Sequence, residues 1–245
     1  MTFAVAEASI RDDVENEVQL EIARERIIGT SIPAIDAFVG GFRSSQITFI
    51  DSSDRMLFDL IHTLCVNAIN TLEGEIVWVD GGNSINPYEL AGLCKRFRMD
   101  MGETLDCINI SRAFTAYQMV TLIIDALEKE VEQTGSELVI VSCFPDLFLD
   151  RDMWWSESFQ LMKRCMSALQ SLTRRHNTVT ILTNYGLTKM LYKKSLRSVL
   201  YGSADKVLRI ENKRDALLLN LVKEGRSMLY HPVPYCQMTL DEFWR

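Results

Sequence analysis

The chain has 245 residues, of which 47% are hydrophobic and 24% are charged, and this composition is typical of one large globular domain. Its formal net charge of −7 argues against a protein that coats nucleic acid by bulk electrostatics. Six scattered cysteines and three widely separated histidines form no sequence-local metal motif, and no apolar run approaches the roughly 20 residues that span a bilayer. We expect a cytoplasmic protein, or a nuclear one in a eukaryotic host, without a bound metal.

Residues 1–26 differ in composition from the rest of the chain. They are acidic and lack glycine, and Val14, Val18 and Ile22 recur at the four-residue spacing of a helix face. We expect an N-terminal arm at 1–26, able to act as an oligomerisation linker, and a single core domain at 27–245.

Strand and helix patterns alternate along the core. Short β-branched runs predict strands at 47–50, 75–80, 137–142, 178–183, 206–210 and 217–222. Four segments have helical length and spacing, at 57–71, 87–98, 117–133 and 159–176. Several of the strands are apolar throughout, which is typical of strands buried on both faces. The pattern predicts an α/β fold with a doubly wound, mainly parallel sheet, helices on both faces and an antiparallel C-terminal edge.

A series of short motifs follows one order along the core. They are Gly29-Thr-Ser-Ile-Pro-Ala-Ile-Asp36, Gly40-Gly41, Ile76-Val-Trp-Val-Asp80, Asn-Pro-Tyr-Glu-Leu at 86–90, Arg96-Phe-Arg-Met-Asp100, Asn109-Ile-Ser-Arg-Ala113 and Gln118-Met119. In this order and spacing the motifs resemble the ATPase core of the RecA/RadA recombinases and their paralogues, over roughly residues 27–230. The resemblance implies a RecA-like P-loop NTPase fold.

The segment that corresponds to the phosphate-binding loop lacks its chemistry. A P-loop reads Gly-x-x-x-x-Gly-Lys-[Ser/Thr], because glycines let backbone N–H groups wrap the phosphates, lysine neutralises them and the hydroxyl binds magnesium. In the register that the resemblance implies, Ser52 and Leu57 stand at the glycines, Phe58 at the lysine and Asp59 at the hydroxyl. We expect a degenerate site with no bound nucleotide or other cofactor.

Shifting the register does not restore the motif. No glycine lies between Gly41 and Gly74, and the first lysine of the chain is Lys95. Asp51 and Asp54 are expected to cap the free N–H groups of the following helix, at the place that a phosphate would take.

Three further positions implied by the resemblance depart from the family pattern. The glutamate that activates water is replaced by Gly81-Gly82, the Walker B aspartate by Ser142, and the glutamine that senses the γ-phosphate by Tyr185. Loss of the cradle, metal ligand, base and sensor leaves nothing for phosphoryl transfer to use. We expect a pseudo-ATPase with no catalytic residue, not an enzyme.

A basic strip lies between Tyr185 and Gly202. It carries Lys189, Lys193, Lys194 and Arg197, with interleaved tyrosines and no acid. In the family this region is the second DNA-binding loop, and cations beside aromatic rings suit single strands. The same spacing also describes an ordinary amphipathic helix, and the sequence leaves both interpretations open.

Two other features suggest partner contacts. Trp154 and Trp155 cannot both point into one core stripe, so one of them is a candidate to meet a partner, a base or the edge of the fold itself. Phe3-Ala-Val-Ala6 matches the Phe-x-x-Ala motif by which recombinase linkers add a strand to a neighbouring subunit. A frayed terminus is the alternative for this motif.

These features lead to one functional hypothesis and two rivals. The first is an inactive recombinase paralogue that acts as an accessory or mediator subunit in homologous recombination and DNA repair. It would bind a recombinase or paralogue as a hetero- or homo-oligomer, and single-stranded DNA as a second ligand. The second is a regulatory scaffold derived from KaiC-like ATPases, and the third is an enzyme with a relocated phosphate site. No membrane contact is expected.

Overall fold

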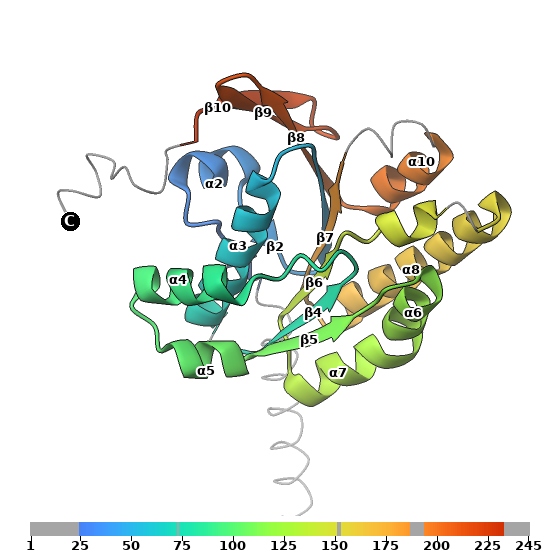
Figure 1. The fold of residues 1–245 in the computed structure, drawn as a ribbon, viewed down its shortest axis with the longest axis horizontal. Helices are drawn as coiled ribbons and strands as arrows, with labels where there is room; N and C mark the ends of the chain where they lie inside the picture. Colours follow the sequence, from blue (N-terminus) through green and yellow to red (C-terminus); the bar gives the residue numbers. More distant parts are fainter. Residues whose placement is uncertain (1–24, 73, 151–152, 187–193, 233–245) are drawn as a thin grey trace, which may run out of the picture.

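The computed structural model describes residues 25–72, 74–150, 153–186 and 194–232. Within these ranges the centre of the molecule is an eight-stranded sheet in the order β10-β9-β8-β3-β7-β6-β4-β5 (Figure 1). Its strands are β3 (Gln46–Ser52), β4 (Ile76–Asp80), β5 (Ile108–Arg112), β6 (Leu138–Ser142), β7 (Val179–Tyr185), β8 (Lys206–Lys213), β9 (Ala216–Leu221) and β10 (Arg226–Tyr230). A short antiparallel pair, β1 (Ile27–Ile28) and β2 (Phe42–Arg43), lies beside it.

The pairing confirms a mainly parallel sheet with an antiparallel C-terminal edge. Strand β3 runs parallel to both β7 and β8, and β4 runs parallel to both β5 and β6. Strand β9 pairs antiparallel with β8 and with β10. The predicted strand at 206–210 therefore has two roles, because β8 joins the parallel sheet on one side and the antiparallel edge on the other.

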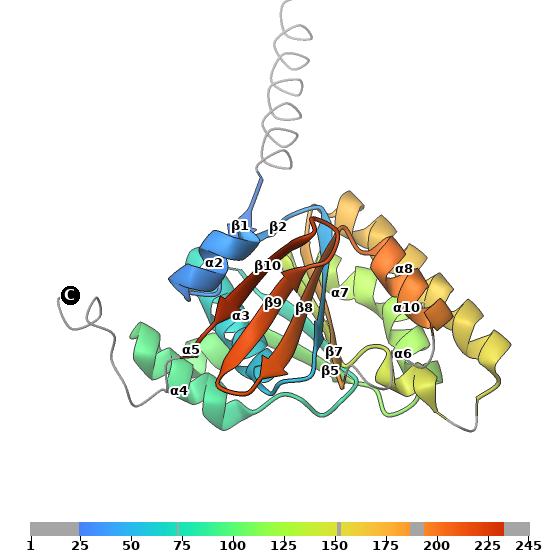
Figure 2. The same cartoon turned by 90° about the horizontal axis from the view of Figure 1, so that it is seen from above.

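Helices cover both faces of the sheet (Figure 2). One face packs against α2 (Pro33–Val39), α3 (Met56–Leu72) and α4 (Pro87–Phe97), with α5 (Met101–Asp106) beside α4. The other face packs against α8 (Trp155–Arg175), α10 (Lys194–Ser203) and one long helix made of α6 (Ala116–Thr121), η1 (Leu122–Ala126) and α7 (Leu127–Thr134). The stretch η1 is a π-helical turn, and the 3₁₀ turn η2 (Asp146–Leu149) follows β6.

The apolar strands owe their composition to burial on both sides. In β4, Ile76 and Trp78 face the α3 layer, whereas Val77 and Val79 face the α8 layer. Because side chains alternate along a strand, a strand between two helical layers must be apolar at every position. Among the described residues, no helix is both long and apolar enough to cross a membrane.

Local sequence sets the helix that follows β4. Asn86 accepts a hydrogen bond from Tyr88 N at 3.1 Å and so caps α4, and Pro87 occupies its first turn. The helix ends at Phe97, and the next residue, Arg98, caps it in a left-handed conformation at φ 58°.

The carboxyl ends of β3, β4, β6 and β7 meet at one edge of the sheet, because these strands run in parallel. They end at Ser52, Asp80, Ser142 and Tyr185 respectively. Open α/β sheets bind their ligands at this edge, so the positions singled out in the sequence gather where a site would be expected.

Candidate functional site

The turn between β3 and α3 is closed by its own side chains. Ser52 Oγ accepts from Asp54 N at 3.0 Å and donates to Asp54 O at 2.9 Å. The Asp54 carboxylate then accepts from Met56 N at 2.9 Å through Oδ1, and from Asn212 Nδ2 at 2.7 Å through Oδ2. The predicted capping role of Asp54 is confirmed.

The other N–H groups at the start of α3 also have partners within the turn. Leu57 N donates to Asp54 O at 3.3 Å, and Phe58 N donates to Arg55 O at 2.9 Å. A helix N-terminus attracts an anion through its unpaired N–H groups. At α3 these groups are already engaged.

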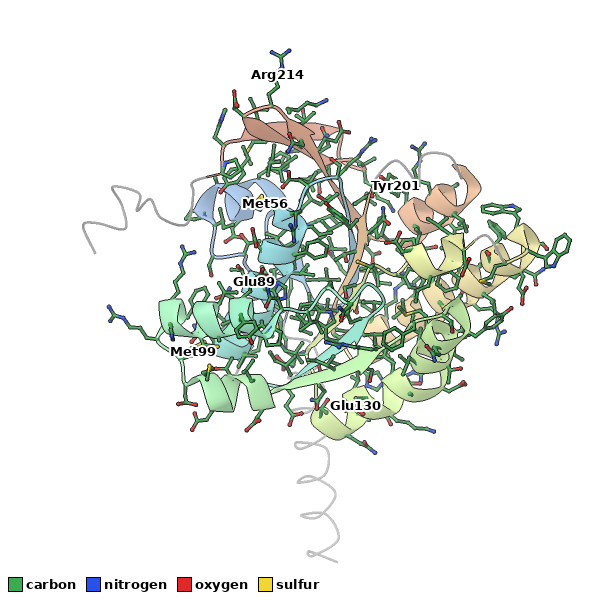
Figure 3. The ribbon with its side chains drawn as sticks, in the orientation of Figure 1. Met56, Glu89, Met99, Glu130, Tyr201 and Arg214 are labelled. Carbon is green, nitrogen blue, oxygen red and sulfur yellow. The ribbon has the colours of Figure 1, made fainter. Side chains whose placement is uncertain are left out.

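The residues at the second glycine, lysine and hydroxyl positions make contacts within the fold. Leu57 is fully buried in the core, and the half-buried Phe58 ring packs on Tyr185 with a centroid distance of 5.1 Å. Asp59 is half-buried, and burial, followed by the nearby carboxylates of Glu89 and Asp54, raises its pKa. Figure 3 shows Glu89 on α4, on the same side of the molecule as Met56 at the start of α3.

Asp80, at the end of β4, is the centre of a buried hydrogen-bond network. Its carboxylate accepts from Ser84 N at 2.9 Å, from Gly82 N at 3.1 Å and from Ser142 Oγ at 2.9 Å. Ser142 Oγ in turn accepts from Trp78 Nε1 at 3.0 Å. Burial acts to raise the Asp80 pKa, but these hydrogen bonds outweigh it and hold the pKa below its ordinary value. Ser142, the Walker B position in the resemblance, therefore acts here as a structural donor.

Gly81 and Gly82 are packed too closely for a side chain. A Cβ on Gly82 would lie 2.4 Å from Cys143 Sγ, and one on Gly81 would lie 2.7 Å from Met119 Cε and 3.1 Å from Ser142 O. A glutamate at either position would require Cys143 or Met119 to move. Glycine is used here for the close approach of two strand ends.

Asp51 does not cap α3, so that part of the sequence interpretation was wrong. The side chain is buried, and its Oδ1 accepts from Asn184 Nδ2 of β7 while its Oδ2 accepts from Tyr201 OH of α10, both at 2.7 Å. Burial raises the Asp51 pKa, and the two hydrogen bonds and the charges of Arg209 and Arg197 oppose that rise. Asp51 pairs in register with Asn184 of β7, one residue before the end of each strand, and this position directs it away from the turn.

His62 was not recognised as part of this region from the sequence. It is fully buried on α3, accepts from Asn86 N at 3.0 Å through Nε2, and lies 2.7 Å from Phe58 O through Nδ1. These contacts require a neutral ring with its proton on Nδ1, and burial lowers its pKa. His62 links the start of α4 to α3. The sequence signal for its contact with Phe58 is their four-residue spacing, which places both on one face of a helix.

The sequence of the chain matches a known protein family. The family model described as Rad51 matches residues 24–194, which is more than half of the chain. The chain belongs to the Rad51 family. The turn after β3 in this Rad51-family chain is the position that the resemblance assigned to the phosphate-binding loop.

The chain is also similar to individual recombination proteins. The human meiotic recombination protein DMC1/LIM15 homolog is 28% identical over 155 residues, which cover 59% of this chain and 46% of that protein. The DNA repair and recombination protein RadA of Cenarchaeum symbiosum (strain A) is 26% identical over 171 residues, or 64% and 42% of the two chains. The DNA repair protein RAD51 of Saccharomyces cerevisiae is 26% identical over 155 residues, or 59% and 38%. The match thus spans less than half the length of these relatives.

The basic strip of this Rad51-family chain is only partly described. Lys189 and Lys193 lie outside the described residues, and Lys194 begins α10. Arg197 is half-buried, with Cζ 5.8 Å from the centroid of the Tyr201 ring. Leu196 and Leu200 are buried at helical spacing, so 194–203 is an amphipathic helix. DNA contact by the strip stays a prediction.

The two tryptophans lie at the start of α8. Trp154 precedes the helix and is 80% exposed, whereas Trp155 is 40% exposed. Tyr117 OH donates to Glu157 Oε1 at 2.7 Å and so holds the start of α6 beside the start of α8. Phe3 and Ala6 lie outside the described residues, and the partner role of all four stays a prediction.

The fold also assembles one cluster that the sequence did not suggest. Glu128 and Glu132 of α7 lie 3.0 and 4.0 Å from Nε2 of His176, at the end of α8. Arg175 also pairs with Glu128. An ion-pair network between the two helices accounts for this surface cluster.

Proposed function

We propose that this chain is a non-hydrolysing accessory subunit of the Rad51 family, with a role in recombination and DNA repair that depends on binding other molecules. The partner we propose is a recombinase or recombinase paralogue, and single-stranded DNA is the proposed second ligand. The similarity to meiotic recombination and DNA repair proteins favours recombination over an unrelated regulatory scaffold.

The observation that carries this proposal is the self-capped turn between β3 and α3. Magnesium and a triphosphate need a flexible glycine loop, a lysine and a hydroxyl, and the residues present do not fit them. Asp54 occupies the first N–H of the helix, Leu57 is committed to the core, and Asp59 presents a carboxylate instead of a hydroxyl. A triphosphate placed there would meet like charge from Asp54, Asp59 and Glu89, with Arg55 as the opposing cation in the turn.

A partner surface is available at the β5 edge. Strand β5 ends the sheet within the described residues, so one side of it is unpaired there. Ile110 on this strand is 44% exposed and Phe114, just after it, is 71% exposed. An extended segment can add to such an edge and place alternate side chains against it. The Phe3-Ala-Val-Ala6 segment of a neighbouring subunit has the composition for this role.

Partner binding is tested by comparing Phe3→Ala with Val5→Ala in the full-length chain. Truncating an aromatic anchor typically costs about 2 kcal/mol or more of binding energy, or roughly 30-fold in affinity. We expect that loss for Phe3→Ala with the host recombinase, measured by light scattering and titration of the mixture. Val5→Ala, at a variable position of the motif, should bind nearly as the wild type does.

Equal affinity for both variants and the wild type would mean that the arm makes no such contact. Failure of the recombinase to bind the wild-type chain at all would refute the proposed partner.

A further inference from the structure

The positive charge of this acidic chain is concentrated in one stretch. From Ser158 to Ala204 there is no aspartate or glutamate, although the chain holds 33 acidic residues and a net charge of −7. The same stretch holds Lys163, Arg164, Arg174, Arg175, Lys189, Lys193, Lys194 and Arg197. It includes most of α8 and all of β7 and α10.

Half of these cations lie on one face of α8, which we name the α8 stripe. The buried face of this helix packs on the sheet, and the opposite face is exposed at helical spacing. Beyond the first turn of the helix, where Trp155 and Ser156 are also exposed, the stripe consists of Gln160, Lys163, Arg164, Ser167, Ser171, Arg174 and Arg175. A helix of 21 residues is about 31 Å long, so the stripe is an extended surface.

The cations of the stripe differ in whether they form ion pairs. Arg175 pairs with Glu128, and Arg174 Nη2 lies 4.0 Å from Asp205 Oδ1. Within the part of the chain that the structure describes, neither Lys163 nor Arg164 forms an ion pair. Among the described residues, these two adjacent cations therefore have no ion-paired carboxylate, and they lie next to the hydroxyls and the amide of the stripe.

The chemistry of the stripe fits a phosphate backbone better than a protein surface. Protein interfaces combine arginine with aromatic and apolar anchors and are depleted in lysine, whereas every side chain of the stripe is a cation, hydroxyl or amide and none is an apolar anchor. Arginine, lysine, serine and glutamine are the side chains that contact phosphate oxygens. The stripe also has no ring on which an unpaired base could stack.

We propose that the α8 stripe binds the sugar–phosphate backbone of double-stranded DNA. A duplex carries one negative charge per roughly 1.7 Å of its axis, and cations spaced along a helix can contact it without reading its sequence. The choice of DNA over RNA rests on the proposed function. The stripe itself uses none of the residues of the β3–α3 turn.

This surface lies beside α10, which is the described C-terminal part of the basic strip that was predicted for single strands. Helices α8 and α10 pack against each other, and Gln170 Nε2 donates to Ser203 O at 2.8 Å between them (Figures 1 and 2). One flank of the molecule thus presents the stripe, which has no aromatic residue, and α10, which carries Arg197 and Tyr201. The two should differ in their preference for duplex and single-stranded DNA.

The test compares two double variants of the full-length chain that lose the same charge. Lys163→Ala with Arg164→Ala removes two cations from the stripe, and Lys95→Ala with Lys129→Ala removes two exposed cations from α4 and α7. Binding to a fluorescent 20-base-pair duplex and to oligo(dT) is measured by anisotropy over a salt titration. Thermal unfolding shows whether each variant is folded.

We expect the stripe variant to bind the duplex roughly tenfold more weakly at low salt, with a log–log salt slope smaller by about 1.8, since each lost contact removes about 0.9. The control variant should keep most of the duplex affinity, and binding of both variants to oligo(dT) should change little. Lys163→Arg should bind as the wild type does.

Three results would overturn the inference. One is a stripe variant that binds the duplex as the wild type does at every salt concentration, and another is an equal loss in the control variant. The third is a loss of recombinase binding or self-association without a loss of duplex binding, which would assign the stripe to a protein partner. A nucleotide-induced shift in melting temperature would instead refute the proposed function and leave this inference standing.

Discussion

At the scale of single residues, the site is distinguished by carboxylates that serve the fold. Asp54 closes the turn before α3 with bonds to Met56 N and Asn212 Nδ2. Asp80 collects donors from Ser84, Gly82 and Ser142 at the end of β4. Each role leads to a prediction about stability.

Removing the Asp54 carboxylate should weaken the start of α3. Asp54→Ala is expected to lower the free energy of unfolding by about 1 kcal/mol, as the loss of an N-cap does. Asp54→Asn keeps an acceptor oxygen and should lose less. Urea denaturation measures both, and an alanine variant as stable as the wild type would show that the cap contributes nothing.

Asp80 should make stability depend on pH in the acid range. Its folded pKa lies below the ordinary value of 3.8, so its ionised form stabilises the fold above that value. The contribution is lost as pH falls from about 3.8 through the lower folded pKa. The stability difference between wild type and Asp80→Asn, from urea unfolding, should therefore be about 1.5–3 kcal/mol near neutral pH and shrink below about pH 4.

The stability difference between the two proteins separates the contribution of Asp80 from those of the nearby carboxylates. Asp51 and Asp59 have raised pKa values and act with the opposite sign, but they are present in both proteins. A difference that stays constant down to about pH 3 would contradict the account.

At the scale of elements, sequence patterns predicted what lies in the centre of the sheet and missed what lies at its edges. The predicted helix at 57–71 is α3, Met56–Leu72, and the predicted strand at 178–183 is β7, Val179–Tyr185. Strands β5 and β10 were missed because an edge strand is half exposed and carries polar residues, as Ile108–Arg112 does. Its pattern therefore lacks the continuous apolar run of a buried strand.

The sequence left two interpretations of the α10 segment open, because the contact that anchors this helix comes from a strand distant in the sequence. Tyr201 projects from α10 (Figure 3), and its hydroxyl reaches Asp51 of β3, 150 residues away in sequence. Burial raises the pKa of Tyr201, so its hydroxyl remains a donor near neutral pH. No local pattern could have revealed this contact.

Tyr201→Phe should therefore destabilise α10 and the whole protein. It leaves a buried carboxylate oxygen without its donor, which costs about 1–3 kcal/mol. Tyr185→Phe is the matched control, since it also removes one tyrosine hydroxyl but keeps the ring that packs on Phe58. Chemical denaturation gives both values, and hydrogen exchange should show faster exchange in 194–203 for Tyr201→Phe. Equal stability of the two variants would contradict the anchoring role.

At the scale of the whole molecule, the order of the sequence motifs identified the family, because several of these motifs lie at the ends of successive strands. The same order located the turn that corresponds to the phosphate-binding loop. The residue types in that turn could then be compared with those that phosphate binding requires. The Asp80 network, the redirected Asp51 and the α8 stripe could not be predicted, because each depends on which strand ends or helix faces become neighbours in space. These features appear only when the sheet order is known.

The most direct test of the account is nucleotide binding by the purified full-length chain. A ligand at 100 times its dissociation constant stabilises a protein by about 2.7 kcal/mol, which corresponds to a rise of roughly 5–10 °C in melting temperature for a chain of this size. With millimolar ATP and magnesium we predict no change in melting temperature, while an active recombinase measured in parallel should be stabilised. A rise of several degrees that is abolished by a substitution at Asp54 would contradict the account.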